Sequence, residues 1–217
     1  MFEGSEFTVC DPGKGRIELL LGPRRMPALQ QALGARAKEV AFAMNAGMFD
    51  EKGQPIGLLV MGGKQVHAIN LNKGGGNFHL LPNGVFAVRK DGRAEVVKSD
   101  AFKPSGDIEF ATQSGPMLVI DGQLHPAFDA DGESRYVRNG VAIAPDGKPR
   151  FIISLDAVSF GKMARFARDQ LHAKNALYFD GSVSSLWSPA DMRQDNVTDL
   201  GPLVVVFKQN AGSAPGP

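Results

Sequence analysis

One pattern that occurs four times constrains the fold of this chain most: an apolar run, a turn containing glycine, and a second apolar run. Asp-Gly and Gly-Gly between such runs are strong hairpin signals, because the tight turn needs a positive φ that glycine adopts without strain. Four hairpins predict a large, mostly antiparallel or mixed sheet. The four segments are 57-GLLVMGGKQVHAI, 84-GVFAVRKDGRAEVV, 116-PMLVIDGQLHP and 140-GVAIAPDGKPRFIIS.

Helical periodicity appears in two segments, 27–40 and 161–173, and a further strand is expected from Glu6 to Cys10. The order strand, helix, strand from Phe151 to Phe179 predicts one βαβ crossover. The expected fold class is therefore α+β or mixed α/β, with a large mixed, hairpin-rich sheet and a few helices packed on it. The predicted helix faces are Leu29, Leu33 and Ala37 in the first segment and Met163, Phe166, Ala167 and Leu171 in the second.

No linker interrupts the chain, so a single domain is expected over residues 1–208. The small, polar, Pro/Gly-rich stretch 209–217 is predicted to be a disordered tail. We expect no membrane span, because no run approaches the roughly 18 apolar residues that a span requires. The first ten residues also lack the basic and apolar regions of a signal peptide.

Charge and cysteine content exclude further classes. The 24 basic and 23 acidic residues form no basic stripe, so nucleic acid is not an expected partner. The single cysteine, Cys10, excludes an internal disulfide framework and a cysteine-based zinc cluster. It is expected to be a free, packed thiol, the alternative being a disulfide partner in a missing N-terminal segment.

Polar residues and glycines follow two predicted strands at the point where each strand ends. The strand from residue 39 runs into Asn45 and Gly47, and the strand from residue 176 runs into Asp180 and Gly181. Loops at the carboxyl ends of strands are where ligands bind in sheets with parallel pairs, which makes Asp180 a candidate site residue. The structural alternative is an Asp-Gly turn followed by serines that cap a short helix, namely Ser182, Ser184 and Ser185.

Two other clusters strengthen the case for a ligand site. Gln113, Ser114 and Gly115 precede one apolar strand, and Arg138 and Asn139 precede another. Arginine offers a planar fork of donors suited to phosphate or carboxylate. Carboxylates, amides, hydroxyls and an arginine are groups that bind sugars and phosphates.

Common catalytic and cofactor motifs are missing from the sequence. It contains no G-x-S-x-G elbow, Walker loop, dinucleotide fingerprint or H-E-x-x-H. The histidines have no ligand spacing, so neither a metal site nor a cofactor is expected; they are His67, His79, His125 and His172.

Six ordered motifs between about residues 39 and 207 resemble the phosphodiester glycosidase family. The resemblance implies a mixed α/β fold and hydrolysis of the bond between an anomeric sugar carbon, GlcNAc-like, and a phosphodiester. Many bacterial members of the family are exported, so an exported or periplasmic location is suspected on this ground alone. The motifs are 43-AMNAGMFDEKGQPIGL, 77-NFHLLPNGVFAV, 111-ATQSGPMLVIDG, 137-VRNGVAI, 175-NALYFDGSVSSLW and 200-LGPLVVV.

Carried over motif by motif, the resemblance implies roles for individual residues. Asp180 would stabilise the oxocarbenium-like centre as nucleophile or as base for water, and Asp156 is the second carboxylate candidate. Asn45 would position a sugar hydroxyl. The full set expected to bind substrate is Asn45, Gly47, Gln113, Ser114, Gly115, Arg138, Asn139, Gly181, Ser182, Ser184 and Ser185, with the phosphate held by Arg138, Gln113, Ser114 and the 182–185 amides.

This chain departs from the family pattern at two places. It has D-G-S-V-S-S at 180–185, where the family has D-G-G-G-S-S, and 155-LDAV, where some members have Asp-Gly-Arg. Both differences favour an alternative, a non-catalytic module that binds a glycan or sugar phosphate in a cell envelope. A phosphodiesterase that cuts P–O is a further alternative. The expected partner is a small-molecule or glycan substrate carrying a sugar-1-phosphodiester, and a monomer is expected.

Overall fold

The computed structural model describes residues 1–196 and 198–209 of the chain. Among these, the strands form three sheets, and every hydrogen-bonded pair of strands is antiparallel. The tail predicted at 209–217 lies outside the described residues apart from Gln209.

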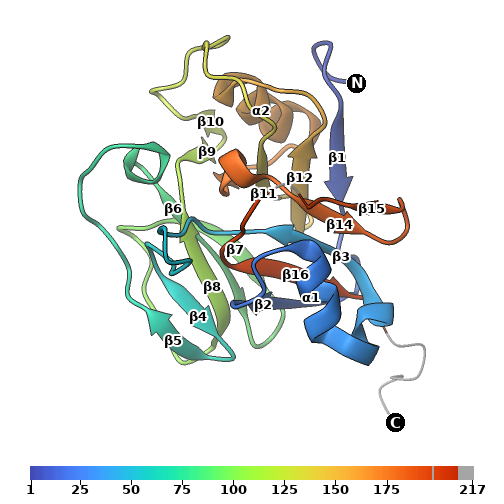
Figure 1. Cartoon of the computed structure of the whole chain (residues 1–217). Coiled ribbons are helices and arrows are strands. Elements are labelled where there is room, and N and C mark those ends of the chain that lie inside the picture. Colours follow the sequence, from blue (N-terminus) through green and yellow to red (C-terminus); the bar gives the residue numbers. More distant parts are fainter. Residues whose placement is uncertain (197, 210–217) are drawn as a thin grey trace.

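One sheet has six strands and forms the upper part of the molecule in Figure 1. The two others have five strands each and are called here the β3 sheet and the β8 sheet after a central strand. In spatial order, the six-stranded sheet consists of β1 (Phe7–Cys10), β12 (Pro149–Ser154), β11 (Asn139–Ile143), β13 (Asn175–Tyr178), β9 (Met117–Ile120) and β10 (Gln123–Leu124). The β3 sheet consists of β15 (Arg193–Gln194), β14 (Leu186–Ser188), β3 (Val40–Asn45), β16 (Leu203–Phe207) and β2 (Arg16–Leu20). The β8 sheet consists of β5 (Lys64–His67), β4 (Leu59–Met61), β8 (Ile108–Ser114), β6 (Gly84–Arg89) and β7 (Ala94–Lys98).

Both predicted helices are present, and each covers one sheet. Helix α1 (Met26–Leu33) has proline in its first turn and ends at Gly34, whose φ is 54°, before a 3₁₀ segment, η1 (Gly34–Glu39). It packs on the β3 sheet through Met26 and Leu29. Helix α2 (Phe160–Arg165) continues as a π-helical turn, η3 (Phe166–Gln170), and packs on the six-stranded sheet. Two further 3₁₀ turns are η2 (Asn77–His79) and η4 (Gly181–Val183).

All four hairpins predicted from the glycine turns are confirmed. They are β4–β5, β6–β7, β9–β10 and β11–β12. Each turn contains at least one glycine with a φ between 55° and 85°, which a residue with a Cβ rarely adopts. These glycines are Gly62, Gly63, Gly92, Gly122 and Gly147.

The prediction of one large mixed sheet is wrong. Strands β12 and β13 lie in the same sheet and are joined through α2, as expected, but β11 lies between them. Since β11 is antiparallel to both, β12 and β13 run in the same direction without bonding to each other. Because β11 forms a hairpin with β12 and lies beside it, β12 and β13 do not form a parallel pair.

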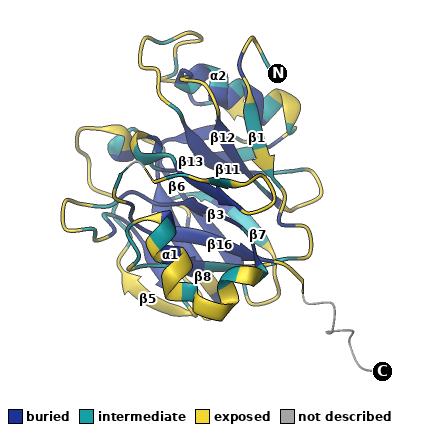
Figure 2. Cartoon of the chain, turned by 45° about the vertical axis from the view of Figure 1, so that its right-hand side comes forward, coloured by how far each residue is buried: buried dark blue, intermediate teal, exposed yellow. Residues whose placement is uncertain are grey.

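A shared apolar core joins the three sheets, and its residues appear as the buried centre of Figure 2. Phe86 of the β8 sheet contacts Phe151 of the six-stranded sheet, with ring centroids 5.7 Å apart. It also contacts Phe179, which directly follows β13, with ring centroids 6.3 Å apart. Phe151 in turn contacts Phe42 of the β3 sheet at 5.5 Å. Because truncating a buried Phe to Ala costs about 3–5 kcal/mol, these rings are a main source of stability.

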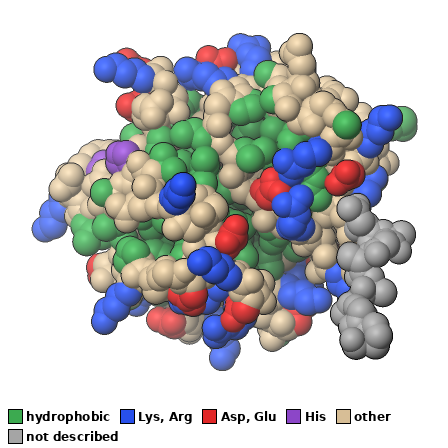
Figure 3. Space-filling view, turned by 90° about the horizontal axis from the view of Figure 1, so that it is seen from below, with side chains coloured by type: hydrophobic (Ala, Val, Ile, Leu, Met, Phe, Trp, Pro, Cys, Tyr) green, Lys and Arg blue, Asp and Glu red, His purple; other side chains and the backbone are tan. Residues whose placement is uncertain are grey.

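Other sequence-based expectations concern the surface and the cysteine. In the part of the chain that the structure describes, no helix is long and apolar enough to cross a membrane. Basic and acidic side chains are interspersed on the face shown in Figure 3. Cys10 is a free, partly buried thiol, and burial raises its pKa to about 11, as expected for a packed cysteine.

Candidate active site

Polar residues from two sheets meet where β3 and β13 end and β11 begins. The amide of Phe179 donates to the carbonyl of Asn139 at 3.0 Å, which holds the chain after β13 against the start of β11. The amide of Asp180 donates to the carbonyl of Ala46 at 3.2 Å, which ties the same segment to the end of β3. The three strand ends that the sequence analysis singled out separately are therefore neighbours in space.

A buried pair of asparagines, Asn45 and Asn139, organises this junction. The Nδ2 of Asn139 donates to the Oδ1 and the backbone oxygen of Asn45 at 2.9 and 2.8 Å. The Nδ2 of Asn45 donates to the carbonyl of Asp180 at 2.8 Å, while its Oδ1 accepts from the amide of Ser185 at 2.8 Å. Asn45 thus holds both ends of the segment 180–185, which we call the 180–185 turn.

Serines close the 180–185 turn from within. The hydroxyl of Ser184 lies 3.0 Å from the carbonyl of Val137 and 3.2 Å from Oδ1 of Asn139. The hydroxyl of Ser185 donates to the carbonyl of Val183 at 2.9 Å. Both hydroxyls are engaged by the protein, so they shape the turn instead of presenting donors to a ligand.

Asp180 is the acidic group at the centre of this arrangement. Its side chain is half-buried, and its Oδ1 accepts a hydrogen bond of 2.8 Å from the hydroxyl of Ser182. Burial raises the pKa of the Asp180 carboxyl above its ordinary value of 3.8, and hydrogen bonds from the side chain and backbone of Ser182 oppose that rise. Asp180 is thus a carboxylate held in a partly desolvated place.

Arg138 lies beneath the turn and is fully buried. Its Nε donates to the carbonyl of Val158 at 2.8 Å, and one terminal nitrogen lies 3.2 Å from the Tyr178 hydroxyl. Its guanidinium carbon lies 3.6 Å from the centre of the Phe160 ring, a close cation–π contact. Among the described residues, none of its hydrogen-bond partners is a carboxylate, so its positive charge is not neutralised locally.

Tyr178 links Arg138 to the turn. Burial raises the pKa of its hydroxyl to about 12, so the group is neutral near pH 7. A Cβ placed on Gly181 would overlap this hydroxyl, which explains why position 181 is occupied by glycine. Tyr178 was not among the candidate residues predicted from the sequence, although it stands two positions before Asp180, a spacing that places side chains on the same face of a strand.

Gln113 has a different role from the one expected. Its Oε1 accepts from the amides of Leu58 and Asn70, both at 2.9 Å. Its Nε2 donates to the carbonyl of Asn70 at 2.7 Å and to the hydroxyl of Ser99 at 3.0 Å. The buried side chain uses its hydrogen-bonding capacity to hold the segment 58–70, which leaves no donor for a phosphate.

The residues around Gln113 have mixed placements. Ser114 is fully buried, and its hydroxyl has no partner among the described residues. Gly115 lies so close to Asn83 that a Cβ would come within 2.5 Å of the Asn83 side chain. Gly47 lies against Thr112, whose hydroxyl a Cβ would overlap. Gly47 and Gly115 are therefore required by close packing of the backbone.

Asp156, the second carboxylate candidate, makes no hydrogen bond to the network around Asp180 among the described residues. It is exposed, and its Oδ2 accepts from the amide of Glu6 at 2.7 Å, beside β1. Asp156 follows β12 and Asp180 follows β13, and β11 lies between these two strands in the sheet.

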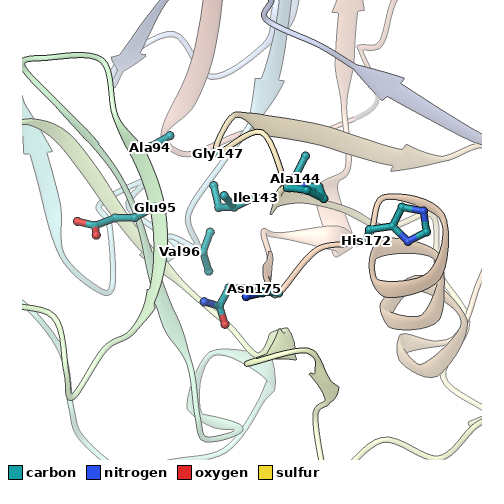
Figure 4. Close-up of a pocket in the computed structure, with 10 residues that line it drawn as sticks. Ala94, Glu95, Val96, Ile143, Ala144, Gly147, His172 and Asn175 are labelled. Atoms are coloured by element: carbon teal, nitrogen blue, oxygen red, sulfur yellow. The ribbon is translucent and has the colours of Figure 1, made fainter.

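Hollows in the surface occur away from this junction. One of about 490 Å³ lies between β7 and the β11–β12 turn, with Val96, Ile143 and Asn175 in its lining (Figure 4). Another, of about 620 Å³, runs along β2 and the ends of β6 and β8. Neither is lined by a residue of the Asn45–Asn139–Asp180 network. In residues 1–196 and 198–209, no three His, Cys, Asp or Glu side chains are grouped so that they could hold a metal ion.

The fold and the junction define a class of protein: antiparallel sheets around a shared core, with a carboxylate and buried amides where strands of two sheets meet. Comparison with known proteins specifies the class further. Residues 38–199 match the phosphodiester glycosidase family. The chain belongs to that family.

One known protein is similar in sequence over about two thirds of this chain. The uncharacterized protein YigE of Escherichia coli (strain K12) is 41% identical over 149 residues, which are 69% of this chain and 58% of that protein. This chain therefore spans little more than half the length of that relative.

Two solved structures share the fold. The catalytic domain of zebrafish N-acetylglucosamine-1-phosphodiester alpha-N-acetylglucosaminidase, auto-inhibited by its pro-peptide, aligns with a TM-score of 0.64 at 16% identity, over 95% of this chain and 83% of that one. A hypothetical protein from Synechocystis aligns with a TM-score of 0.60 at 15% identity, over 96% and 61% of the two chains.

Proposed function

We propose that this chain hydrolyses the C–O bond between the anomeric carbon of a GlcNAc-like sugar and a phosphodiester. In this reaction water adds to the anomeric carbon, the bond from that carbon to the phosphate oxygen breaks, and the bond's electron pair leaves with the phosphate. The products are the free sugar and a phosphate monoester, and one proton is released. Membership of the phosphodiester glycosidase family supports this reaction class.

The observation that carries the proposal is the placement of Asp180. Its carboxylate is half-buried at the rim of a turn that two buried asparagines hold rigidly to the ends of β3 and β11. A fixed carboxylate in a partly desolvated site stabilises positive charge at an anomeric carbon more strongly than one in water. Asp180 is proposed as this group, acting as nucleophile or as base for water.

One carboxylate suffices for this chemistry because of the leaving group. A phosphate ester leaves far more readily than a sugar alkoxide, so a strong general acid is less necessary than in ordinary glycosidases. Asp156 is exposed and accepts a hydrogen bond from the Glu6 amide, and it is given no part in the proposed mechanism.

Arg138 is proposed to act on the phosphate through space. Its guanidinium bonds to Val158, Tyr178 and Ser134 and is fully buried, so a direct contact with substrate would require the surrounding structure to open. Its charge, however, lies just behind Tyr178 and Gly181 in a low-dielectric interior. The resulting positive potential favours an anion near the 180–185 turn.

The test is product analysis by mass spectrometry after incubation with a panel of GlcNAc-1-phosphodiesters in ¹⁸O water. We expect label in the released sugar with the natural protein and with Asp156→Asn, and no product with Asp180→Asn. Label in phosphate would refute the proposal and indicate P–O cleavage. Substrate binding without turnover in all three proteins would indicate a sugar-phosphate binding module instead.

A further inference from the structure

The carboxylate of Asp180 depends on one neighbouring side chain. The hydroxyl of Ser182 donates to its Oδ1 at 2.8 Å, and Ser182 is itself exposed. Within residues 1–196 and 198–209, no other side chain donates to this carboxylate, and no basic side chain forms an ion pair with it.

This contact acts against the effect of burial. Desolvation raises the pKa of Asp180, whereas the hydrogen bonds from Ser182 lower it. A hydrogen bond to the charged form of a carboxylate also restricts its rotation, because one oxygen is kept on the donor. Ser182 thus acts on both the charge and the direction of the Asp180 carboxylate.

We propose that Ser182 is a positioning residue, which holds the Asp180 carboxylate deprotonated and oriented toward the anomeric carbon through the bond from its hydroxyl to Oδ1. This inference rests on the proposed function, in which Asp180 acts at that carbon. It replaces the expectation that Ser182 contacts the substrate. Position 182 of the 180–185 turn is a serine, and the hydroxyl of this one residue accounts for the effect on the Asp180 carboxylate.

Other charged groups do not confuse the titration of Asp180. Tyr178 of β13 interacts electrostatically with Asp180, Arg138 next to the start of β11 bonds to the Tyr178 hydroxyl, and the end of β3 contributes the neutral Asn45. Burial holds the pKa of Tyr178 at about 12, and an arginine stays protonated throughout the range in which a carboxyl titrates. A titration in the acid range at this site therefore reports Asp180.

A direct test follows the Asp180 carboxyl by ¹³C NMR as the pH is varied, with its signal identified by its loss in Asp180→Asn. Removal of the hydroxyl in Ser182→Ala is expected to raise the pKa of Asp180, and Ser182→Thr, which keeps a hydroxyl, is expected to restore it. Ser105→Ala is the matched control, because Ser105 also donates to an aspartate two residues away, Asp107, in the loop between β7 and β8. This control is expected to leave the Asp180 titration unchanged.

Kinetics provide the second readout. In Ser182→Ala the acid limb of the pH–rate profile is expected to move to higher pH, and kcat/KM near neutral pH to fall about tenfold, with most of the loss in kcat. An unchanged Asp180 titration in Ser182→Ala would overturn the role of Ser182, whether or not the protein turns over a substrate. A shifted titration in a protein that hydrolyses no sugar phosphodiester would leave Ser182 in place and refute the proposed function.

Discussion

Two polar clusters in this molecule look alike in sequence and differ in what their atoms do. The 180–185 turn and the segment around Gln113 both combine polar side chains with glycine at a strand end. Around Gln113, the amide is used up by bonds to Leu58, Asn70 and Ser99. At the turn, two asparagines and two serines make the structural bonds, and Asp180 keeps a half-buried carboxylate with one side-chain donor, Ser182, among the described residues. A polar cluster is a candidate site when some of its residues make the hydrogen bonds that hold the structure and a different residue carries a reactive group that those bonds leave available.

The comparison is tested most strongly by removing the reactive group. Asp180→Asn is expected to lower kcat/KM by about a thousandfold, since a positioned acid or base contributes about 10²–10⁴-fold. Steady-state kinetics on a sugar-1-phosphodiester measures this loss. Asp156→Asn is the control and is expected to stay close to the natural protein, because Asp156 is exposed and bonded to Glu6. Equal losses in the two variants would remove the distinction between the carboxylates.

The opposite result is expected at Gln113. Gln113→Leu leaves the amides of Leu58 and Asn70 without their buried acceptor, and the free energy of unfolding should fall by about 3 kcal/mol. Urea unfolding measures the change. Gln123→Leu, at an exposed position of β10, is expected to change it by less than about 0.5 kcal/mol. If Gln113→Leu is as stable as the natural protein but fails to bind substrate, Gln113 belongs to the ligand site.

A smaller effect is expected at the contact between the turn and the strand below it. Gly181→Ala places a methyl group where the Tyr178 hydroxyl lies, so we expect it to cost about 1–3 kcal/mol of stability. Adding Tyr178→Phe to the same chain should recover part of that cost, which a double-mutant cycle would detect. Gly75→Ala, which meets no atom within 4 Å, is the neutral control. Additive effects of the two changes would show that the overlap is relieved in another way.

The smallest effect concerns pH and stability. Because the pKa of Asp180 is raised in the folded state, the folded chain binds this proton more tightly than the unfolded chain. Its contribution to stability is present below the unfolded pKa, near 3.8, and is lost as the pH rises through the higher folded value. Asp180→Asn removes this loss, so the stability of the variant relative to the natural protein should be higher at pH 7 than at pH 4. Urea unfolding of both proteins at pH 4 and pH 7 measures this. If the difference in the free energy of unfolding between the variant and the natural protein is the same at both pH values, the pKa of Asp180 is not raised.

Local signals in the sequence predicted local structure well. The four hairpins follow from their glycine turns, and both helices follow from apolar spacing, because these features depend on a few consecutive residues. Sheet order is not a local property. Strand β11 lies between β12 and β13 in the sheet, so these two strands do not pair and the segments that carry Asp156 and Asp180 follow non-adjacent strands.

The candidate site was predictable in part, because the strand ends that carry its residues can be located from a few consecutive residues. Asn45, Asn139 and Asp180 were identified by their places at strand ends, and the structure brings them together. The sequence does not show which partners a polar side chain takes, so Gln113 and Arg138 were assigned to direct phosphate binding. In the structure the donors of Gln113 bond within the protein, and the guanidinium of Arg138 is fully buried. The contact of Tyr178 with Arg138 joins residues 40 positions apart, and no sequence pattern indicated it.

The buried charge of Arg138 has a consequence for ionic strength. Dissolved ions screen charges on the surface over about 8 Å at physiological salt, but they do not enter a packed interior. The guanidinium lies among Phe160, Tyr178 and backbone carbonyls with none of its surface exposed. An anion drawn to the 180–185 turn by this charge is therefore expected to bind with only a weak dependence on salt, unlike one held by exposed lysines.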